Sequence, residues 1–249
     1  MYPIDLEGKK ILLTGCEGGL GQAMLKILTE ANATVILVDI LKPEKSIQYL
    51  QSKQKKVWWY QCDLSRTDEI KRLFKAVADD LGSLNVLINN AGIRKDALLV
   101  RLTEDDWDDV IDTNLKGVFL CTQAAVKLML RKKIKNGKVI TISSIAGIFG
   151  NVGQTNYAAA KAGVIAMTKT WTKEYGQRGL SFNAVAPGLI ESPMTRSLPE
   201  QDIQRFTAAI PSGALGKPDD VAKAVLFLCS PLSDYVNGEV IHVDGGVVI

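Results

Sequence analysis

Residues 9–39 read KKILLTGCEGGLGQAMLKILTEANATVILVD. Apolar runs at 9–14 and 33–39 enclose a glycine-rich turn and a segment, 19–31, whose apolar residues recur with a helical period. Short continuous apolar runs bounded by turn residues are typical of strands that are buried on both faces. The stretch therefore predicts a β-α-β unit whose two strands are parallel.

The same alternation of strand and helix continues to the end of the chain. Further strands are predicted at 56–62, 84–90, 138–143, 180–187 and 239–245, and helices at 66–81, at about 103–133, at 155–176 and at 218–229. Thr103, with Asp106 three residues later, is the predicted N-cap of the helix at 103–133. Alternating strands and helices imply a parallel sheet with helices on both faces.

We therefore expect one α/β domain over 1–249, a Rossmann-like doubly wound fold with a seven-stranded parallel sheet. The cofactor half would span about 1–135 and the catalytic, substrate-binding half about 136–249. Residues 189–217 contain several prolines and glycines and are expected to form an irregular lid with one short helix.

The composition narrows the class of protein. Of the 249 residues, 47% are hydrophobic and 23% are charged, and the net charge of +3 gives no electrostatic reason to expect nucleic acid or a membrane surface. No apolar run is long enough to span a membrane, and the first residues lack the apolar core of a signal peptide. We therefore expect a cytoplasmic protein. No metal site is expected, because the cysteines are far apart and His242 is the only histidine.

The glycine-rich turn after the first strand is the candidate cofactor loop. Its spacing is G-x-x-x-G-x-G, and its candidate contacts are Gly15, Glu17, Gly19, Leu20 and Gly21. Glycines let a diphosphate approach the backbone, and the following helix N-terminus offers free N–H groups. A turn of this kind can also be only a turn, but its place between strand and helix favours a dinucleotide site.

Asp39 ends the second predicted strand, where a carboxylate can accept hydrogen bonds from a ribose and would repel a 2′-phosphate. Glu17 adds a second negative charge, and Lys42 is the only nearby cation that argues otherwise. These residues predict that NAD(H) is preferred over NADP(H). The alternative for Asp39 is a turn residue at a strand end.

Ser144, Tyr157 and Lys161 form the candidate proton-transfer group. Tyr157 and Lys161 are four residues apart in a predicted helix, so they lie on one face. An ammonium nearby would lower the tyrosine pKa toward neutrality, and Ser144 could hold a substrate oxygen beside the phenol. A Tyr-x-x-x-Lys spacing alone is common, so the assignment depends on the rest of the chain.

Taken together, these motifs resemble the short-chain dehydrogenase/reductase family over the whole chain. The resemblance implies a catalytic tetrad of Asn114, Ser144, Tyr157 and Lys161, with a water held by Asn114 linking Lys161 to solvent. It adds cofactor contacts at Ile40, Asp63, Leu64, Asn90, Ala91, Gly92, Pro187, Gly188, Ile190 and Thr195, besides Tyr157 and Lys161. From local chemistry alone, Asn90 and Asn114 could instead pair with backbone groups, and Asp63 could cap a helix.

Within the family, stretches such as NNAGIRKDALLVRL and GQTNYAAAKAG look most like 3-oxoacyl-(acyl-carrier-protein) reductases. This resemblance implies reduction of a 3-oxoacyl thioester, a carrier-protein contact through Lys135 and Arg178, and a homotetramer packed through 103–131, 155–176 and the last strand. An apolar face at Val164, Met167 and Trp171 would suit such packing or a core. The alternatives are an NAD-dependent dehydrogenase of another secondary alcohol, sugar or sterol, and a non-catalytic dinucleotide sensor.

Overall fold

A computed structural model describes residues 4–192 and 207–247 of the chain. Its centre is a seven-stranded sheet in the order β3-β2-β1-β4-β5-β6-β7, and every neighbouring pair is parallel. The strands are β1 (Lys10–Thr14), β2 (Thr34–Asp39), β3 (Trp58–Gln61), β4 (Val86–Asn89), β5 (Gly137–Ile142), β6 (Leu180–Pro187) and β7 (Val240–Val243). The predicted seven-stranded parallel sheet is thus confirmed.

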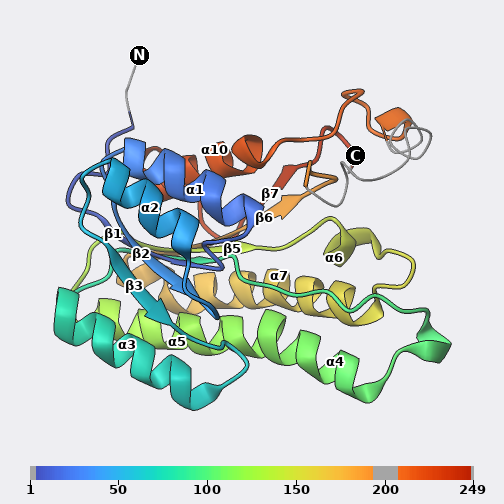
Figure 1. Cartoon of the computed structure of the whole chain (residues 1–249), viewed down its shortest axis with the longest axis horizontal. Helices are drawn as coiled ribbons and strands as arrows, with labels where there is room; N and C mark the ends of the chain where they lie inside the picture. Colours follow the sequence, from blue (N-terminus) through green and yellow to red (C-terminus); the bar gives the residue numbers. More distant parts are fainter. Residues whose placement is uncertain (1–3, 193–206, 248–249) are drawn as a thin grey trace.

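Helices cover both faces of the sheet (Figure 1). One layer contains α1 (Gly19–Glu30), α2 (Glu44–Ser52) and α10 (Pro218–Cys229). The other contains α3 (Thr67–Leu81), α4 (Glu104–Ile111), α5 (Gly117–Arg131) and α7 (Thr155–Tyr175). The short α6 (Ala146–Phe149) follows β5, and single turns lie at η1 (Leu99–Arg101), η3 (Gly176–Arg178) and η4 (Pro231–Ser233).

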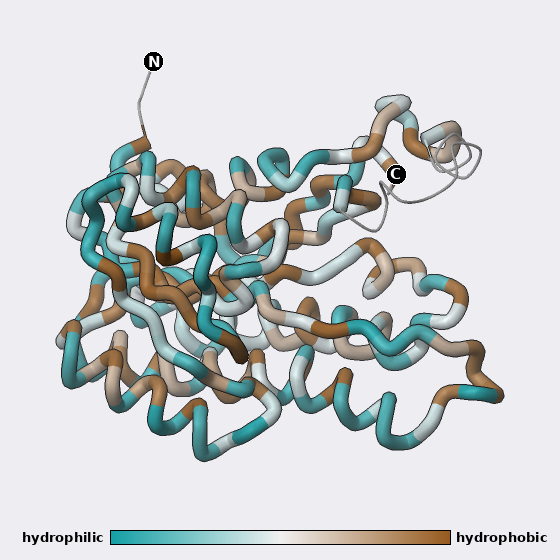
Figure 2. Tube along the Cα trace, in the orientation of Figure 1, coloured by the Kyte–Doolittle hydropathy of each residue, from teal (hydrophilic) through white to brown (hydrophobic). Residues whose placement is uncertain are grey.

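The hydrophobic core is split by the sheet into two clusters. Ile11 and Leu13 of β1 face the layer of α1 and α10, whereas Leu12 between them faces the layer of α3 and α5. Because successive side chains of a strand point to opposite faces, strands buried on both sides must be apolar throughout. Figure 2 shows the complementary pattern on α3, where hydrophilic and hydrophobic residues alternate along the helix.

The direction in which the chain crosses the sheet reverses at β1, which pairs with β2 on one side and β4 on the other. In doubly wound folds, a crevice opens at this reversal, outside the carboxyl ends of the strands. The ends of β1 and β4, at Thr14 and Asn89, therefore mark where a ligand site is expected.

The predicted helix at 103–133 is three pieces. Thr103 is the N-cap, since its Oγ1 accepts from the Asp106 N–H at 3.1 Å, as expected. Between α4 and α5, however, Asp112–Lys116 is π-helical. Such widened turns often occur at functional sites, and this one carries Asn114. Two short helices, α2 and α6, were not predicted from the sequence.

Part of the apolar face of α7 packs in the core. Val164 is fully buried, and the ring of Trp171 lies 6.1 Å from that of Phe182 on β6. Met167 and Trp171 are half-buried.

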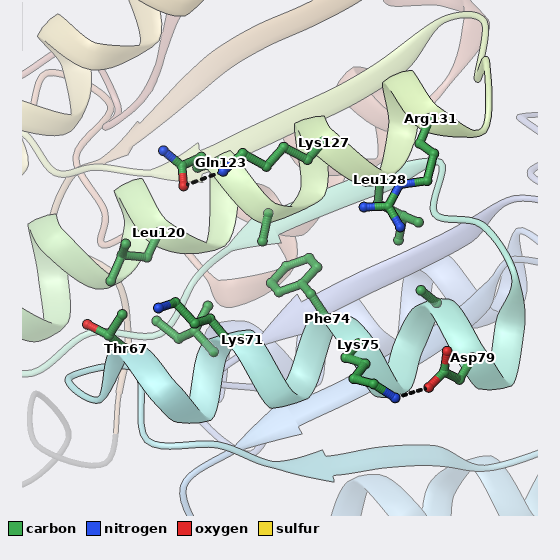
Figure 3. Close-up of a pocket in the computed structure, with 13 residues that line it drawn as sticks. Thr67, Lys71, Phe74, Lys75, Asp79, Leu120, Gln123, Lys127, Leu128 and Arg131 are labelled. Carbon is green, nitrogen blue, oxygen red and sulfur yellow. Dashed lines mark hydrogen bonds and ion pairs between the residues drawn. The ribbon is translucent and has the colours of Figure 1, made fainter.

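A groove with a cavity of about 500 Å³ lies between α3 and α5 (Figure 3). Phe74 points into it, and Lys71, Lys75, Lys127 and Arg131 lie along its two sides. None of its lining residues is a predicted site residue. Among the residues described, no helix combines the length and apolar character needed to cross a membrane.

Candidate functional site

The glycine loop between β1 and α1 requires glycine at two positions. Gly15 has φ +64°, and a Cβ there would come within 2.7 Å of the Ala91 Cα. A Cβ on Gly21 would collide with the Gly15 carbonyl oxygen. The loop therefore packs tightly against the end of β4 on one side and against the first turn of α1 on the other.

The N-terminus of α1 is open to a ligand. Gly18 caps the helix without a side-chain hydrogen bond, and within the described chain no acidic residue occupies the first turn. A Cβ on Gly19 would meet nothing within 4 Å. Exposed N–H groups at the positive end of a helix, with no side chain in front of them, fit the diphosphate of a dinucleotide. Leu20 is half-buried and packs against the core below.

Thr14 and Asn90, at the ends of β1 and β4, hold this loop in place by hydrogen bonds. The Asn90 amide donates to the main-chain oxygens of Thr14 (3.0 Å) and Gly15 (2.9 Å). The Thr14 hydroxyl accepts from the N–H groups of Asn90 and Ala91 and donates to the Ile88 carbonyl. Asn90 thus pairs with backbone groups, the alternative that local chemistry left open, and in doing so it fixes the loop.

The carboxylates of Glu17, in the cofactor loop, and of Asp39, at the end of β2, both accept hydrogen bonds from other groups of the chain. Asp39 accepts from the Glu17 N–H (3.0 Å) and the Ile40 N–H (2.9 Å). The Glu17 carboxylate accepts from the N–H groups of Lys45 and Ser46 and from the Ser46 hydroxyl, at 2.9–3.2 Å. Glu17 is therefore the cap of α2, on an element that the sequence analysis had not identified.

The residues assigned to the adenine end lie beyond β2 and β3. Ile40 follows Asp39 and is exposed, and Leu64 is buried in the core. Asp63 Oδ1 accepts from the Ser65 N–H (2.9 Å) and hydroxyl (2.7 Å). Asp63 therefore holds the turn before α3, close to the capping role given as its alternative.

Ser144, Tyr157 and Lys161 meet at the carboxyl end of β5. The Ser144 side chain lies close enough to the Tyr157 phenol to act on its pKa. Lys161 Nζ lies 5.6 Å from the centroid of the Tyr157 ring and donates to the Ile142 carbonyl at 2.7 Å. The structure thus brings together the three side chains that the sequence placed in two separate segments.

The electrostatics differ from the prediction. Burial raises the pKa of Tyr157, while Arg94 and Ser144 act to lower it and Asp96 to raise it. Lys161 is buried, and the cost of desolvating its charge lowers its pKa to about 8. The predicted lowering of the tyrosine pKa by Lys161 is not found, because burial dominates both groups.

Asn114 is fully buried, in the π-helical turn beside this group. Its amide pairs with both backbone groups of Ile93: Oδ1 accepts at 2.9 Å and Nδ2 donates at 2.8 Å. A Cβ on Gly92 would lie 3.1 Å from Asn114 Oδ1 and 3.6 Å from Lys161 Nζ. Because Gly92 has no side chain, the segment after β4 can pass close to Asn114 and Lys161.

The segment after β6 packs against the turn that follows β5 and against the end of β7. The Pro187 carbonyl accepts from the Ile145 N–H, and Gly188 packs so closely on Asp244 that a Cβ would lie 2.8 Å from its Cα. Ile190 forms a single bridge with Gly216. Thr195, and the part of the predicted lid from 193 to 206, lie outside the described residues.

Lys135 and Arg178 lie beside each other but not beside the site. Each precedes a strand by two residues, and those strand starts, Gly137 and Leu180, are paired. Both cations are exposed at the amino edge of the sheet. The length of β5, about 17 Å at 3.3 Å per residue, separates this edge from Ile142 and Lys161.

Two polar residues that the sequence analysis missed lie next to Tyr157. Asn156 is fully buried, and Gln154, 5% exposed, donates to Asp96 at 2.9 Å. Their signal in the sequence was weak: polar side chains just before a candidate catalytic tyrosine. Within the described ranges, no group of three or more metal-binding side chains occurs.

The fold and site define a class: a doubly wound α/β protein with a dinucleotide loop and a Ser-Tyr-Lys group at the carboxyl edge of its sheet. The chain belongs to the short-chain dehydrogenase/reductase family. A family model described as Enoyl-(Acyl carrier protein) reductase matches residues 15–248.

Curated relatives are similar over nearly the whole chain. The 3-oxoacyl-[acyl-carrier-protein] reductase FabG of Thermotoga maritima is 48% identical over 98% of this chain and 99% of its own. The proteins of the same name from Vibrio cholerae (40%; 98% and 99%) and Staphylococcus aureus (42%; 96% and 98%) are also similar. A solved structure from Agrobacterium tumefaciens, of a protein proposed to be a 2-deoxy-d-gluconate 3-dehydrogenase, superposes with a TM-score of 0.89 at 35% identity, covering 99% of both chains.

That solved structure contains bound NADP, and it overturns the predicted preference for NAD(H) over NADP(H). The prediction rested on the charges of Asp39 and Glu17. Both carboxylates instead accept hydrogen bonds from the backbone of this chain. Asp39 accepts from the N–H groups of Glu17 and Ile40. Glu17 accepts from N–H groups at the start of α2. Their presence in the sequence was therefore insufficient to decide the cofactor.

Proposed function

We propose that this protein is an oxidoreductase that uses a nicotinamide dinucleotide to reduce a 3-oxoacyl thioester, carried by acyl carrier protein or coenzyme A, to the 3-hydroxyacyl form. The observation that carries the proposal is the grouping of Ser144 and Tyr157 beside the buried Lys161, at the sheet edge that also bears the open glycine loop. The names of the curated relatives support the substrate class.

The residues of the loop fit such a cofactor. The N–H groups at the start of α1 would hold the diphosphate, with Gly19 leaving room for it. Asp39, Ile40, Asp63 and Leu64 would border the adenosine end, and Asn90 to Gly92, Pro187, Gly188, Ile190 and Thr195 the nicotinamide end. When bound, the reduced nicotinamide supplies a hydride to the substrate carbonyl carbon.

The side chains of this protein manage the proton and the charge. Tyr157 donates a proton to the carbonyl oxygen as it becomes an alkoxide, and Ser144 donates a hydrogen bond to the same oxygen. Lys161 would hold a ribose hydroxyl of the bound cofactor and, with Asn114, would link the phenol to solvent for proton resupply. Because the Tyr157 pKa is raised, the phenol is protonated at neutral pH, the form required of an acid in the reductive direction.

Two observations each favour another candidate. The family model is described as an enoyl reductase. The solved structure is of a protein proposed to be a 2-deoxy-d-gluconate 3-dehydrogenase, which favours oxidation of a secondary alcohol. Oxidation of another secondary alcohol would use Tyr157 as a base, whose raised pKa is less suited to that role at neutral pH. A non-catalytic dinucleotide sensor is not favoured, because a protein that only binds the cofactor has no need of an assembled Ser-Tyr-Lys group.

The test follows oxidation of NADPH and of NADH by the purified protein with acetoacetyl-CoA, and with crotonyl-CoA as the enoyl substrate. We expect turnover of acetoacetyl-CoA that is lost in Tyr157→Phe. Turnover of crotonyl-CoA alone would assign an enoyl reductase. No turnover of either, with cofactor binding demonstrated, would reject the thioester proposal and favour the secondary alcohols.

The further assignments are a homotetramer, a cytoplasmic location and an acidic carrier that contacts Lys135 and Arg178. Charge reversal of both cations tests the contact: KM for a carrier-bound substrate should rise while KM for acetoacetyl-CoA stays unchanged. Because the pair lies at the amino edge, an unchanged KM for the carrier substrate would place the contact elsewhere. Light scattering tests the tetramer. Four buried thiols fit a reducing compartment.

A further inference from the structure

Asn156 joins three parts of the chain at the start of α7. Its Oδ1 accepts from the Tyr157 N–H at 2.8 Å, and its Nδ2 donates to the carbonyls of Lys95 (3.1 Å) and Asp106 (3.0 Å). The side chain is fully buried. All of its hydrogen-bonding partners are thus main-chain groups in the segment after β4, in α4 and in α7.

The segment that Asn156 holds carries the charges that face Tyr157. Arg94 and Asp96 flank Lys95 and act on the phenol with opposite signs. The Lys95 side chain reinforces the same junction, since it pairs with Asp106 (3.0 Å) and Asp109 (2.6 Å) on α4. Gln154 adds a second tie through its hydrogen bond to Asp96.

We propose that Asn156 is a positioning residue, which sets the first turn of α7, and with it the Tyr157 phenol, against the segment 94–97. The proposal rests on the proposed function of Tyr157 as the proton donor. The reason is geometric: the Tyr157 N–H donates to the side-chain oxygen of Asn156, and the side-chain nitrogen of Asn156 donates to carbonyls in two other segments, at Lys95 and Asp106. A misplacement of about 1 Å at a reacting group can cost about 100-fold in rate.

Asn183 provides a matched control. It is also a buried asparagine, 2% exposed, whose amide donates to the Val236 carbonyl and accepts from the Glu239 N–H. It ties β6 to the segment before β7, and its hydrogen bonds go to Val236 and Glu239, neither of which is a proposed site residue. Asn156→Ala and Asn183→Ala both leave buried backbone groups unpaired, so both should lose stability.

The experiment measures kcat and KM with acetoacetyl-CoA for both variants, well below their unfolding temperatures. We expect kcat to fall about 10- to 100-fold in Asn156→Ala, with KM for the cofactor changed less than about twofold because the glycine loop is untouched. In Asn183→Ala, kcat should match the wild type. Equal losses of kcat in the two variants, or none in Asn156→Ala, would overturn the proposal.

Asn156→Asp adds a test that a merely structural role would not pass. When protonated, the aspartic acid can still accept from Tyr157 N–H and donate to one carbonyl, but when ionised it can only accept and faces two carbonyl oxygens. The nearby Lys95 and Tyr157, and the carboxylates of Asp96, Asp106 and Asp109, complete its charged surroundings. We expect its kcat, relative to the wild type, to fall as pH rises, whereas the deficit of Asn156→Ala stays constant.

A readout without substrate separates this proposal from the proposed function. The ¹³Cζ resonance of Tyr157, assigned with Tyr157→Phe, should move in Asn156→Ala and stay in place in Asn183→Ala. If the wild type turns over no thioester but the resonance moves, the proposed substrate is wrong and the positioning role stands. An unmoved resonance in Asn156→Ala rejects the positioning role whatever the substrate.

Discussion

The ammonium of Lys161 lies 5.6 Å from the centre of the Tyr157 ring, yet its 2.7 Å hydrogen bond goes to the Ile142 carbonyl at the end of β5. The lysine is therefore fixed to the sheet rather than to the phenol. Of the side chains around the phenol, Arg94 and Ser144 act to lower its pKa. Burial has the largest effect and raises the Tyr157 pKa, so the phenol is protonated at neutral pH.

Tyr157→Phe should abolish most turnover. Loss of a positioned general acid costs about 10²- to 10⁴-fold in kcat, whereas the cofactor contacts of the glycine loop remain. Steady-state kinetics and a fluorescence titration with NADPH check the two halves. A variant that keeps wild-type kcat would reject the acid assignment, and one that no longer binds cofactor would leave the loss of turnover without a chemical interpretation.

Lys161→Met should change how stability depends on pH. Burial lowers the Lys161 pKa from 10.5 to about 8, so the unfolded chain holds this proton more tightly than the folded one. The penalty is fully present below pH 8 and disappears as pH rises from 8 to 10.5, which raises the stability of the wild type by about 3 kcal/mol relative to the variant.

Urea unfolding of both proteins at pH 7 and pH 10 measures this difference, in which the other titrating groups cancel. The Met variant also leaves the Ile142 carbonyl without its donor, but that cost does not vary with pH. If the difference in unfolding free energy between wild type and variant is the same at pH 7 and pH 10, burial does not lower the Lys161 pKa.

Two glycines of the cofactor loop should respond differently to alanine. Gly19→Ala places a methyl group in open space at the start of α1, so folding should be unharmed while the affinity for NADPH falls. Gly21→Ala forces a methyl group against the Gly15 carbonyl and should lower the melting temperature. Calorimetry and cofactor titration on both variants test the pair. Unchanged NADPH affinity in Gly19→Ala would place the diphosphate elsewhere.

Glu17→Gln should destabilise the protein by about 1 kcal/mol, because the carboxylate caps the N-terminus of α2 with three accepted hydrogen bonds. Glu44→Gln is the matched control: Glu44 lies in the first turn of the same helix but is exposed and pairs only with Lys42. Chemical denaturation of both variants compares them. Equal losses would mean that only the charge near the helix end matters.

Much of the fold was decided by local sequence. The apolar runs at 9–14 and 33–39 cannot be exposed on either face, so they must lie inside a sheet covered on both sides, and the connecting helical period makes that sheet parallel. The Tyr157–Lys161 spacing placed both side chains on one helix face. The glycine-rich turn was also recognisable from the sequence, although the contact that requires glycine at position 15 is made by Ala91, after β4.

Only the tertiary structure decided what each polar group does. The sequence gives the charges of Asp39 and Glu17 and the amide of Asn90, but it does not give their hydrogen-bond partners. In the folded chain all three bond to backbone groups of the cofactor loop or of α2. The Lys161 pKa depends on burial, which arises from contacts between distant segments. Asn156 gains its role in the same way, because Lys95 and Asp106, 61 and 50 residues away, reach it only once the chain has folded.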